Sequence, residues 1–319
     1  MTTGPGRDAA LRLVIDRIRL LDSDVREFTL RAGDRGRLPS FPPGSHLAVR
    51  WGPGEQNSYS LTGPEVEPDH YTIAVRLDPA GRGGSRWLHS RRTGDPLDVS
   101  RPRSGFAPVA AARHHLFVAG GIGVTAILSH MRAAVRWGRS FEVLYAHRGT
   151  RAPYAAELVA LAPGSLTRCG SRAQLWERLH PALRDSPLGT HLYVCGPGPM
   201  IDAVAAAARA AGWPPQRVHS ELFAPAPQPA GTPFTARLRR TGAAIPVAAT
   251  TTLLDALRAH GTPVPNLCRR GVCGECRITV LDGAIEHRDT YLAPDERAAG
   301  DSMMACVSRA ASPQLEIDL

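Results

Sequence analysis

A chain of 319 residues is long for one domain and fits two or three, each large enough to bury its own core. Hydrophobic residues make up 43% and charged residues 21%, as in a globular protein in water, and no apolar run approaches the roughly 18 to 20 residues of a membrane helix. The net charge of +9 rests on arginine alone and falls on residues 1–233, which suits phosphate-bearing cofactors at least as well as DNA, so we expect neither a nucleic-acid nor a membrane partner.

Residues 11–108 alternate apolar and polar side chains in short runs such as LRLVIDRIRLL and YTIAVRLD, separated by glycine and proline. This pattern predicts an antiparallel β-barrel, to which we assign residues 1–110. Arg12, Asp16 and Arg17 interrupt the first run, so it lacks the apolar stretch of a signal peptide, and we expect a cytoplasmic protein.

From about residue 114 the pattern changes to strands that alternate with helices. HHLFVAGGIGVTAILSHMRAAVRWG is an apolar strand, a glycine turn and a helix, and THLYVCGPGPMIDAVAAAARAAG repeats this order. The alternation predicts an α/β domain with a doubly wound parallel sheet over residues 111–225. Gly120, Gly121 and Gly123 would let a pyrophosphate approach the backbone at the start of the helix. Their turn departs from G-x-G-x-x-G, but the second turn, YVCGPGPM, also follows a strand and supports a ligand site.

The segment APAPQPAGTP, residues 224–233, has four prolines and almost no side chain able to build a core. It predicts a semi-rigid linker, which we place at residues 226–233. Two short strands, the helix TLLDALRAHG, a cysteine-rich loop and further strands near CRITVLDG and QLEIDL follow it. Residues 234–319 are therefore expected to form a third domain.

The loop NLCRRGVCGECRITV, residues 266–280, holds three cysteines at the spacing C-x4-C-x2-C, and a fourth lies in MMACVSRA. A disulfide framework, a zinc site, an iron–sulfur cluster and unrelated buried cysteines are the alternatives. A reducing cytoplasm argues against disulfides, and zinc sites usually pair two short C-x2-C or C-x2-H halves. The spacing is that of a plant-type [2Fe–2S] cluster, and the loop's glycines would let it turn and point N–H groups at the sulfurs. The expected ligands are Cys268, Cys273, Cys276 and Cys306.

The stretch from TLLDALRAHG through NLCRRGVCGECRITVLDGAIEHRDTYL to MMACVSRA resembles the ferredoxin domain of the phthalate dioxygenase reductase and vanillate demethylase reductase family. That family is similar to this chain in domain order too: a flavin barrel, a nicotinamide domain and then the ferredoxin. The resemblance covers essentially the whole chain, and it implies an α+β (β-grasp) fold for residues 234–319.

The resemblance also implies a flavin site in the barrel. QNSYSLTG resembles the family motif R-x-Y-S-L, whose tyrosine, here Tyr59, packs on the isoalloxazine, and whose serine, here Ser60, reaches the ring nitrogen that accepts hydride. The motif arginine is Asn57 in this chain, and Arg76 or Arg82 would have to compensate. YTIAVRLDPAGRGGSRWLH is similar to the family phosphate loop and, with no adenosine-binding element, implies FMN, although GRGGS alone fits a solvated hairpin equally well. The implied flavin residues are Asn57, Ser58, Tyr59, Ser60, Ala74, Val75, Arg76, Arg82, Gly83, Gly84 and Ser85, with Phe223 closing over the ring or else packing at a domain edge.

For the nicotinamide, the resemblance implies that Cys195, Gly196 and Pro197 line it and that Thr125 lies between it and the flavin. Without the resemblance Cys195 would be interpreted as a buried residue at a strand end, as Cys169 is. The residues expected to act in hydride transfer are Ser60, Thr125 and Cys195.

These parts together predict a reductase that passes electrons from NADH through FMN and a [2Fe–2S] cluster to a separate terminal oxygenase, of the Rieske type and acting on aromatic compounds or in O-demethylation. A reductase for a haem-thiolate monooxygenase and a non-catalytic redox sensor are the alternatives. NADPH stays open as the coenzyme, because Arg148 and Arg151 could hold its 2′-phosphate and their turn lacks an acidic residue for the ribose hydroxyls. We expect a monomer.

Overall fold

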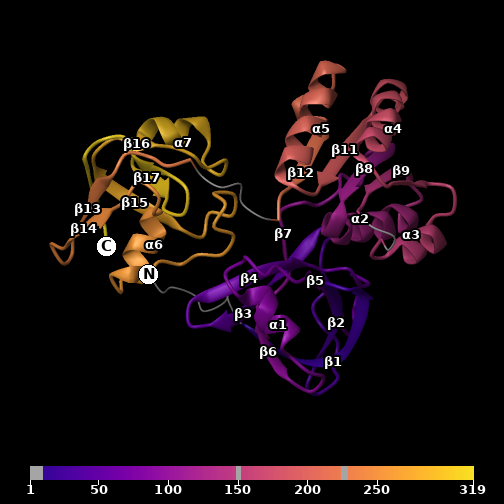
Figure 1. Ribbon diagram of the computed structural model, residues 1–319, viewed down its shortest axis with the longest axis horizontal. Helices are drawn as coiled ribbons and strands as arrows, with labels where there is room; N and C mark the ends of the chain where they lie inside the picture. The colour runs from indigo at the N-terminus through magenta and orange to yellow at the C-terminus, as the bar shows by residue number, and fades with distance from the viewer. Residues whose placement is uncertain (1–9, 149–151, 224–228) are drawn as a thin grey trace. The chain divides into compact units, whose positions relative to one another are not determined.

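The computed structural model describes residues 10–148, 152–223 and 229–319 (Figure 1). The chain divides into two compact units between residues 223 and 224. Within the described ranges, the first unit holds an antiparallel and a parallel sheet, and the second holds a mixed sheet and a small two-stranded one. The predicted combination of fold classes is confirmed. None of the helices in these ranges is long and apolar enough to cross a membrane.

The antiparallel sheet of the first unit has the strand order β4-β3-β6-β1-β2-β5, with β7 paired to β3. An isolated antiparallel bridge between Leu61 and Ile73 joins the end of β4 to β5 and closes the sheet into the predicted barrel. Alternate side chains such as Leu13 and Ile15 fill its interior. The elements are β1 (Leu11–Asp22), β2 (Val25–Ala32), β3 (Ser45–Gly52), β4 (Glu55–Ser60), β5 (Tyr71–Arg76), α1 (Gly84–His89), β6 (Pro96–Val99) and β7 (Arg103–Ser104).

The second sheet of this unit is parallel throughout, with the strand order β10-β9-β8-β11-β12. Phe117 and Tyr193 pack under α2 on one face, while Leu116 and Leu192 pack under α4 and α5 on the other. Both faces are buried, which explains the continuous apolar runs and confirms the doubly wound prediction. The elements are β8 (His114–Gly120), η1 (Gly121–Gly123), α2 (Val124–Arg136), β9 (Ser140–Ala146), α3 (Ala155–Leu161), β10 (Leu166–Cys169), α4 (Arg172–Asp185), β11 (Thr190–Cys195), α5 (Gly198–Ala210), η2 (Pro215–Arg217) and β12 (Val218–Glu221).

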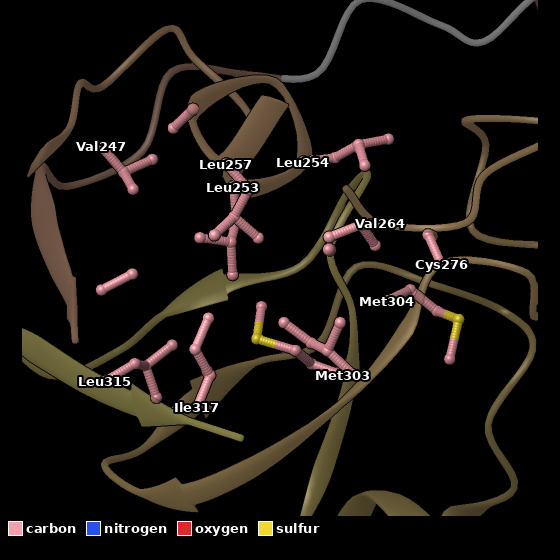
Figure 2. Packing of buried hydrophobic residues seen from close by; sticks show 14 of the residues in the cluster. Val247, Leu253, Leu254, Leu257, Val264, Cys276, Met303, Met304, Leu315 and Ile317 are labelled. Carbon is pink, nitrogen blue, oxygen red and sulfur yellow. The ribbon is translucent and has the colours of Figure 1, made fainter. Parts of the chain in front are cut away.

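The second unit packs one helix against a mixed sheet of strand order β14-β13-β19-β15-β17, in which β13 and β19 run parallel. Figure 2 shows Leu253 and Leu257 of α6 above Leu315 and Ile317 of β19. A helix covering a mixed sheet agrees with the β-grasp expectation. The elements are β13 (Phe234–Leu238), β14 (Ala244–Val247), α6 (Leu253–Ala259), β15 (Arg277–Asp282), β16 (Ile285–Glu286), α7 (Pro294–Ala299), β17 (Ser302–Met304), β18 (Arg309–Ala310) and β19 (Gln314–Ile317).

Part of the proline-rich segment is hydrogen-bonded to this second unit. An Nη of Arg288 donates to the carbonyl of Pro229 at 2.9 Å, and an Nη of Arg309 donates to that of Thr232 at 3.1 Å. Residues 229–233 of the linker predicted at 226–233 therefore lie against the ferredoxin unit, and residues 226–228 lie outside the described residues. The boundary between residues 110 and 111 stays a prediction.

Candidate functional site

Four cysteines of the second unit form two pairs of thiols. Cys268 and Cys273 hydrogen-bond to each other, as do Cys276 and Cys306. The neighbouring thiol of Cys273 lowers the pKa of Cys268, and that of Cys306 likewise lowers the pKa of Cys276. A [2Fe–2S] cluster needs two protein ligands on each of its two irons, so two thiol pairs have the chemistry that it requires.

The structure also bears on disulfide bonds and on single-metal sites at these cysteines. All six cysteines of the chain are free, so no disulfide competes for the thiols. Within residues 10–148, 152–223 and 229–319, no three His, Cys, Asp or Glu side chains are placed so that they could hold one metal ion. Cys169 is buried at the end of β10, as expected.

Backbone N–H groups of the cysteine loop point at the sulfurs. The N–H of Arg270 donates to the Sγ of Cys268 at 3.2 Å. Cys276 and burial raise the pKa of Cys306, and a hydrogen bond from the backbone of Gly271 opposes that rise. Such donors stabilise thiolate sulfur. The four thiols and these donors fit a bound [2Fe–2S] cluster.

Two glycines give the loop its turns. Gly271 has φ +70° and Gly274 has φ +80°, in the left-handed region that favours glycine. A Cβ on Gly271 would lie 2.6 Å from Cγ2 of Val307, and one on Gly274 would lie 2.4 Å from the ring of Tyr291. At Gly271 a Cβ would also lie 2.9 Å from Cα of Asp289, so the loop depends most on this glycine.

Buried hydroxyl groups without protein partners lie at the end of β4. Ser58 Oγ is buried and has no hydrogen-bond partner among the described residues. Burial raises the pKa of Tyr59 to about 12. Its hydroxyl makes no hydrogen bond of normal geometry within the described ranges, although the Asn57 amide is near enough to lower that pKa in part. Buried polar groups left in this way suit a ligand with polar atoms of its own.

The glycine-rich loop before α1 packs tightly on this strand end. Gly83 has φ +117°, and a Cβ on Gly84 would lie 2.6 Å from Nδ2 of Asn57 and 2.7 Å from Nε1 of Trp51. Ser85 Oγ accepts from the backbone N–H of Asp78 at 3.0 Å, which fixes the turn. From its sequence alone, the GRGGS loop fits a solvated hairpin equally well. In the structure it packs against Asn57, the residue that replaces the motif arginine.

A charged side chain reaches Asn57 from the loop. An Nη of Arg82 donates to Oδ1 of Asn57 at 3.4 Å, and the other lies 3.3 Å from a carboxylate oxygen of Glu55. Trp51 Nε1 also donates to Oδ1 of Asn57, at 3.3 Å. The guanidinium of Arg82 therefore stands beside the position where the motif places its arginine.

The two turns of the parallel sheet touch backbone to backbone. They follow β8 and β11, which are neighbours with Cys195 opposite Ala119. A Cβ on Gly123 would lie 2.2 Å from the carbonyl oxygen of Cys195, and one on Gly196 would lie 3.0 Å from Cα of Gly120. Ligands of parallel sheets bind at this carboxyl edge of the strands.

The other candidate cofactor residues of the parallel-sheet domain differ in burial and hydrogen bonding. The hydroxyl of Thr125 donates to the carbonyl of Ile122 at 3.0 Å, and Cys195 is completely buried. Pro197 caps the start of α5, and Phe223 packs at the edge of the α2 core. Arg148 is exposed after β9, and Arg151 lies outside the described residues.

Within the first unit, the barrel site meets the nicotinamide site. The end of β5, which carries Ala74, Val75 and Arg76, faces η1, and an Nη of Arg76 lies 3.9 Å from where a Cβ on Gly121 would be. Residues expected to bind flavin and residues expected to bind nicotinamide are thus neighbours. Stacking of the two rings needs such an arrangement.

Sequence reasoning missed two side chains that pack against the glycines of the site. Trp51 touches the glycine loop, and Met200 lies where a Cβ on Gly120 would come within 2.7 Å of its methyl group. An aromatic residue at the end of a strand was the only hint of the first. Nothing local marked the second.

The comparisons with known proteins agree with this arrangement. Residues 99–218 match the family model "Dimethylamine monooxygenase subunit DmmA-like, N-terminal domain", and residues 237–311 match "2Fe-2S iron-sulfur cluster binding domain". The heme-dependent oxidative N-demethylase beta subunit of Ectopseudomonas mendocina (strain ymp) is 40% identical over 95% of this chain and 96% of its own length. The vanillate O-demethylase oxidoreductase of Pseudomonas sp. (strain HR199 / DSM 7063) is 35% identical over 97% of this chain and 100% of its own. The solved structure of phthalate dioxygenase reductase superposes with a TM-score of 0.77 at 33% identity, covering 97% of this chain and 98% of that one.

Proposed function

The chain belongs to the phthalate dioxygenase reductase and vanillate demethylase reductase family, whose flavin and [2Fe–2S] reductases pass electrons from NAD(P)H to an oxygenase subunit, and on this premise we propose that its flavin is FMN and its coenzyme NADH. The observation that supports hydride transfer from the coenzyme to the flavin is the nearness of β5 to η1, because it brings the candidate flavin and nicotinamide residues together.

FMN is supported by the packed loop before α1. Gly83 and Gly84 lie against the barrel beside the guanidinium of Arg82, where a terminal phosphate could accept hydrogen bonds. Extraction of the purified protein should give one FMN and two iron atoms per chain. FAD in place of FMN, or zinc in place of iron, would contradict the proposal.

The proposed residue roles follow the motifs. A bound flavin accepts hydride and returns its two electrons singly, and a [2Fe–2S] cluster carries one. Tyr59 would pack on the flavin ring, Ser60 would hold the ring nitrogen that takes the hydride, and Cys195 and Thr125 would orient the nicotinamide. The proposed cluster ligands are Cys268, Cys273, Cys276 and Cys306, and the other proposed contacts are Asn57, Ser58, Ala74, Val75, Arg76, Arg82, Gly83, Gly84, Ser85, Gly120, Gly121, Gly123, Gly196, Pro197 and Phe223.

NADH is the proposed coenzyme, and Arg148 is the residue that would favour NADPH. Its side chain is exposed after β9, in a turn that offers no acidic partner for ribose hydroxyls. The ratio of kcat/KM for the two coenzymes tests the proposal. A ratio that favours NADPH and is lost in Arg148→Gln would overturn it.

The proposed acceptor is a demethylating oxygenase, because two relatives that align over nearly the whole chain are named for N- and O-demethylation. A Rieske-type oxygenase is the first candidate. A haem-dependent one is the second, favoured by the relative at 40% identity, which is named for a heme-dependent N-demethylase. NADH-driven demethylation with purified oxygenases of each class separates the two, and slow ferricyanide reduction by the reductase alone would instead indicate a redox sensor. We also propose a cytoplasmic monomer without nucleic-acid binding, which gel filtration and a salt-dependent gel shift would test.

A further inference from the structure

A polar cluster joins the nicotinamide domain to the flavin barrel within the first unit. The hydroxyl of Tyr154, at the start of α3, donates to Oε2 of Glu27 on β2 at 2.6 Å. Arg19 on β1 grips the same carboxylate with two hydrogen bonds of 3.0 Å and also bonds to Glu157 of α3. A forked guanidinium–carboxylate pair has a fixed geometry, so this cluster sets one relative position of α3 and the barrel.

Tyr154 is held in a conformation that its own chemistry disfavours. Its backbone has φ +63°, in the left-handed region, although it is not a glycine, and the residue is 5% exposed. Such a backbone persists only where the surroundings determine it, and residues of this kind cluster at functional sites. The strained backbone indicates that Tyr154 has a functional role, which an ordinary exposed tyrosine would not need.

Each side of Tyr154 leads to one half of the proposed hydride-transfer site. On the barrel side, its hydroxyl lies 3.4 Å from Oγ1 of Thr62, two residues after Ser60. On the other side, Tyr154 packs in the apolar core that also contains Val124 of α2 and Cys195. Tyr154 therefore connects the core beneath the residues expected to meet the coenzyme with the segment expected to meet the flavin.

We propose that Tyr154 is a positioning residue for hydride transfer, whose hydroxyl, through Glu27 and Arg19, keeps the nicotinamide domain at the distance from the barrel at which nicotinamide and flavin react. The inference rests on the proposed function for the places of the two rings. Hydride transfer is sensitive to the separation of donor and acceptor, so a small shift of the domain slows it without removing any ligand contact.

The test is Tyr154→Phe in the full-length protein with its cofactors, studied by stopped-flow reduction of the flavin. At saturating NADH the rate should fall about tenfold or more, while the dissociation constant for NADH changes less than about twofold. The kinetic isotope effect with NADH deuterated at the transferred position should rise, because hydride transfer becomes more rate-limiting. Glu27→Gln should show the same pattern.

Tyr71→Phe is the matched control, because it too removes the hydroxyl of a buried tyrosine, but one whose hydrogen bond, to the carbonyl of Pro39 at 2.6 Å, stays within the barrel. It should lower thermal stability and leave the reduction rate within about twofold of the parent. Parent-like reduction in Tyr154→Phe, or an equal loss in Tyr71→Phe, would overturn the proposal. If Tyr154→Phe fails to fold, a parent-like rate of flavin reduction in Glu27→Gln would overturn the proposal. Failure of the parent itself to take hydride from NADH would instead refute the proposed function.

Discussion

At the scale of single residues, the cysteine loop depends on the absence of a side chain at Gly271 as much as on its thiols. Gly271 combines a left-handed backbone with a neighbour, Val307, that any Cβ would meet at 2.6 Å. Gly271→Ala should therefore displace the loop and lower the iron content of the purified protein well below the parent's. Iron analysis and the visible absorbance of the cluster measure the effect.

Gly242 provides the control for this prediction. Its φ of +72° is nearly the same, but nothing lies within 4 Å of a Cβ placed there. Gly242→Ala should lose only the roughly 1 to 2 kcal/mol of left-handed strain and keep its iron. Equal iron in both variants would mean that the loop adapts and that the close contact has no role.

Arg82 is the side chain that the structure places beside Asn57, so it is expected to supply the charge that the motif arginine supplies in the family. Arg82→Met should weaken flavin binding by roughly 1.5 to 3 kcal/mol, or about tenfold to a hundredfold, since a hydrogen bond to a charged group is lost. Equilibrium dialysis measures the dissociation constant. Asn57→Arg in the same background should restore affinity.

Arg92→Met, which changes an exposed arginine elsewhere on the barrel, should bind flavin as the parent does. A parent-like dissociation constant for Arg82→Met would assign the charge to another group, such as Arg76. A double variant that stays as weak as Arg82→Met would show that position 57 is not where the charge is needed.

At the scale of elements, the parallel sheet contains histidines that its packing keeps neutral. His115 of β8 is fully buried, and its ring stacks on Phe117 with centroids 5.4 Å apart. Burial, with smaller contributions from neighbouring charges, lowers the pKa of His115 from 6.5 to about 4. His130 of α2, whose Nε2 bonds to the carbonyl of Phe106 at 2.6 Å, is lowered to about 3 for the same main reason.

These shifts predict an acid-labile nicotinamide domain. Between pH 6.5 and 4 the unfolded chain binds a proton at His115 and the folded chain does not, so stability falls as the pH falls. His115 alone should account for roughly 2 kcal/mol between pH 7 and pH 5. Hydrogen exchange of β8 amides, corrected for the intrinsic rate, should show this loss in the parent and less of it in His115→Phe.

The exposed His180 of α4 serves as the control, because His180→Gln changes an imidazole outside the core. The pH dependence of β8 protection should be the same in this variant as in the parent. Protection in His115→Phe that falls with pH as steeply as in the parent would assign the acid sensitivity to other groups, His130 first among them.

Strands and helices with strong periodicity are predicted from the sequence. Contacts and backbone conformations that depend on packing between distant segments are not. The apolar run of β8 and the glycine turn after it were recognised because a buried parallel strand and a tight strand-to-helix turn leave local patterns. The contact of Trp51 with Gly84 and the left-handed backbone of Tyr154 leave none, since both arise from segments distant in sequence. The hydrogen bonds to Pro229 and Thr232 in the predicted linker leave no local pattern for a related reason: the arginines that donate them lie far along the chain.

At the scale of the whole molecule, the division after Phe223 allows the order of electron flow to be tested. A chain that stops at Phe223 keeps both sheets of the first unit and omits the residues that Arg288 and Arg309 hold. It should bind flavin, take hydride from NADH and reduce ferricyanide at a rate close to the parent's. Reduction of cytochrome c, a one-electron protein acceptor, should fall sharply, because the cluster is the proposed exit for single electrons.

Cys276→Ser in the full chain tests the same step with less disturbance, since it removes one proposed ligand and leaves both units in place. Cys276 is buried in the core of the ferredoxin unit beside Met304 (Figure 2), so iron content must be measured together with the folding of that unit. Cys169→Ser, at a buried cysteine of the nicotinamide domain, is the control and should keep both the cluster and cytochrome c reduction. If the truncated chain and Cys276→Ser both reduced cytochrome c as fast as the parent after confirmed loss of iron, electrons would leave from the flavin. The ferredoxin unit would then have to serve another purpose than electron exit.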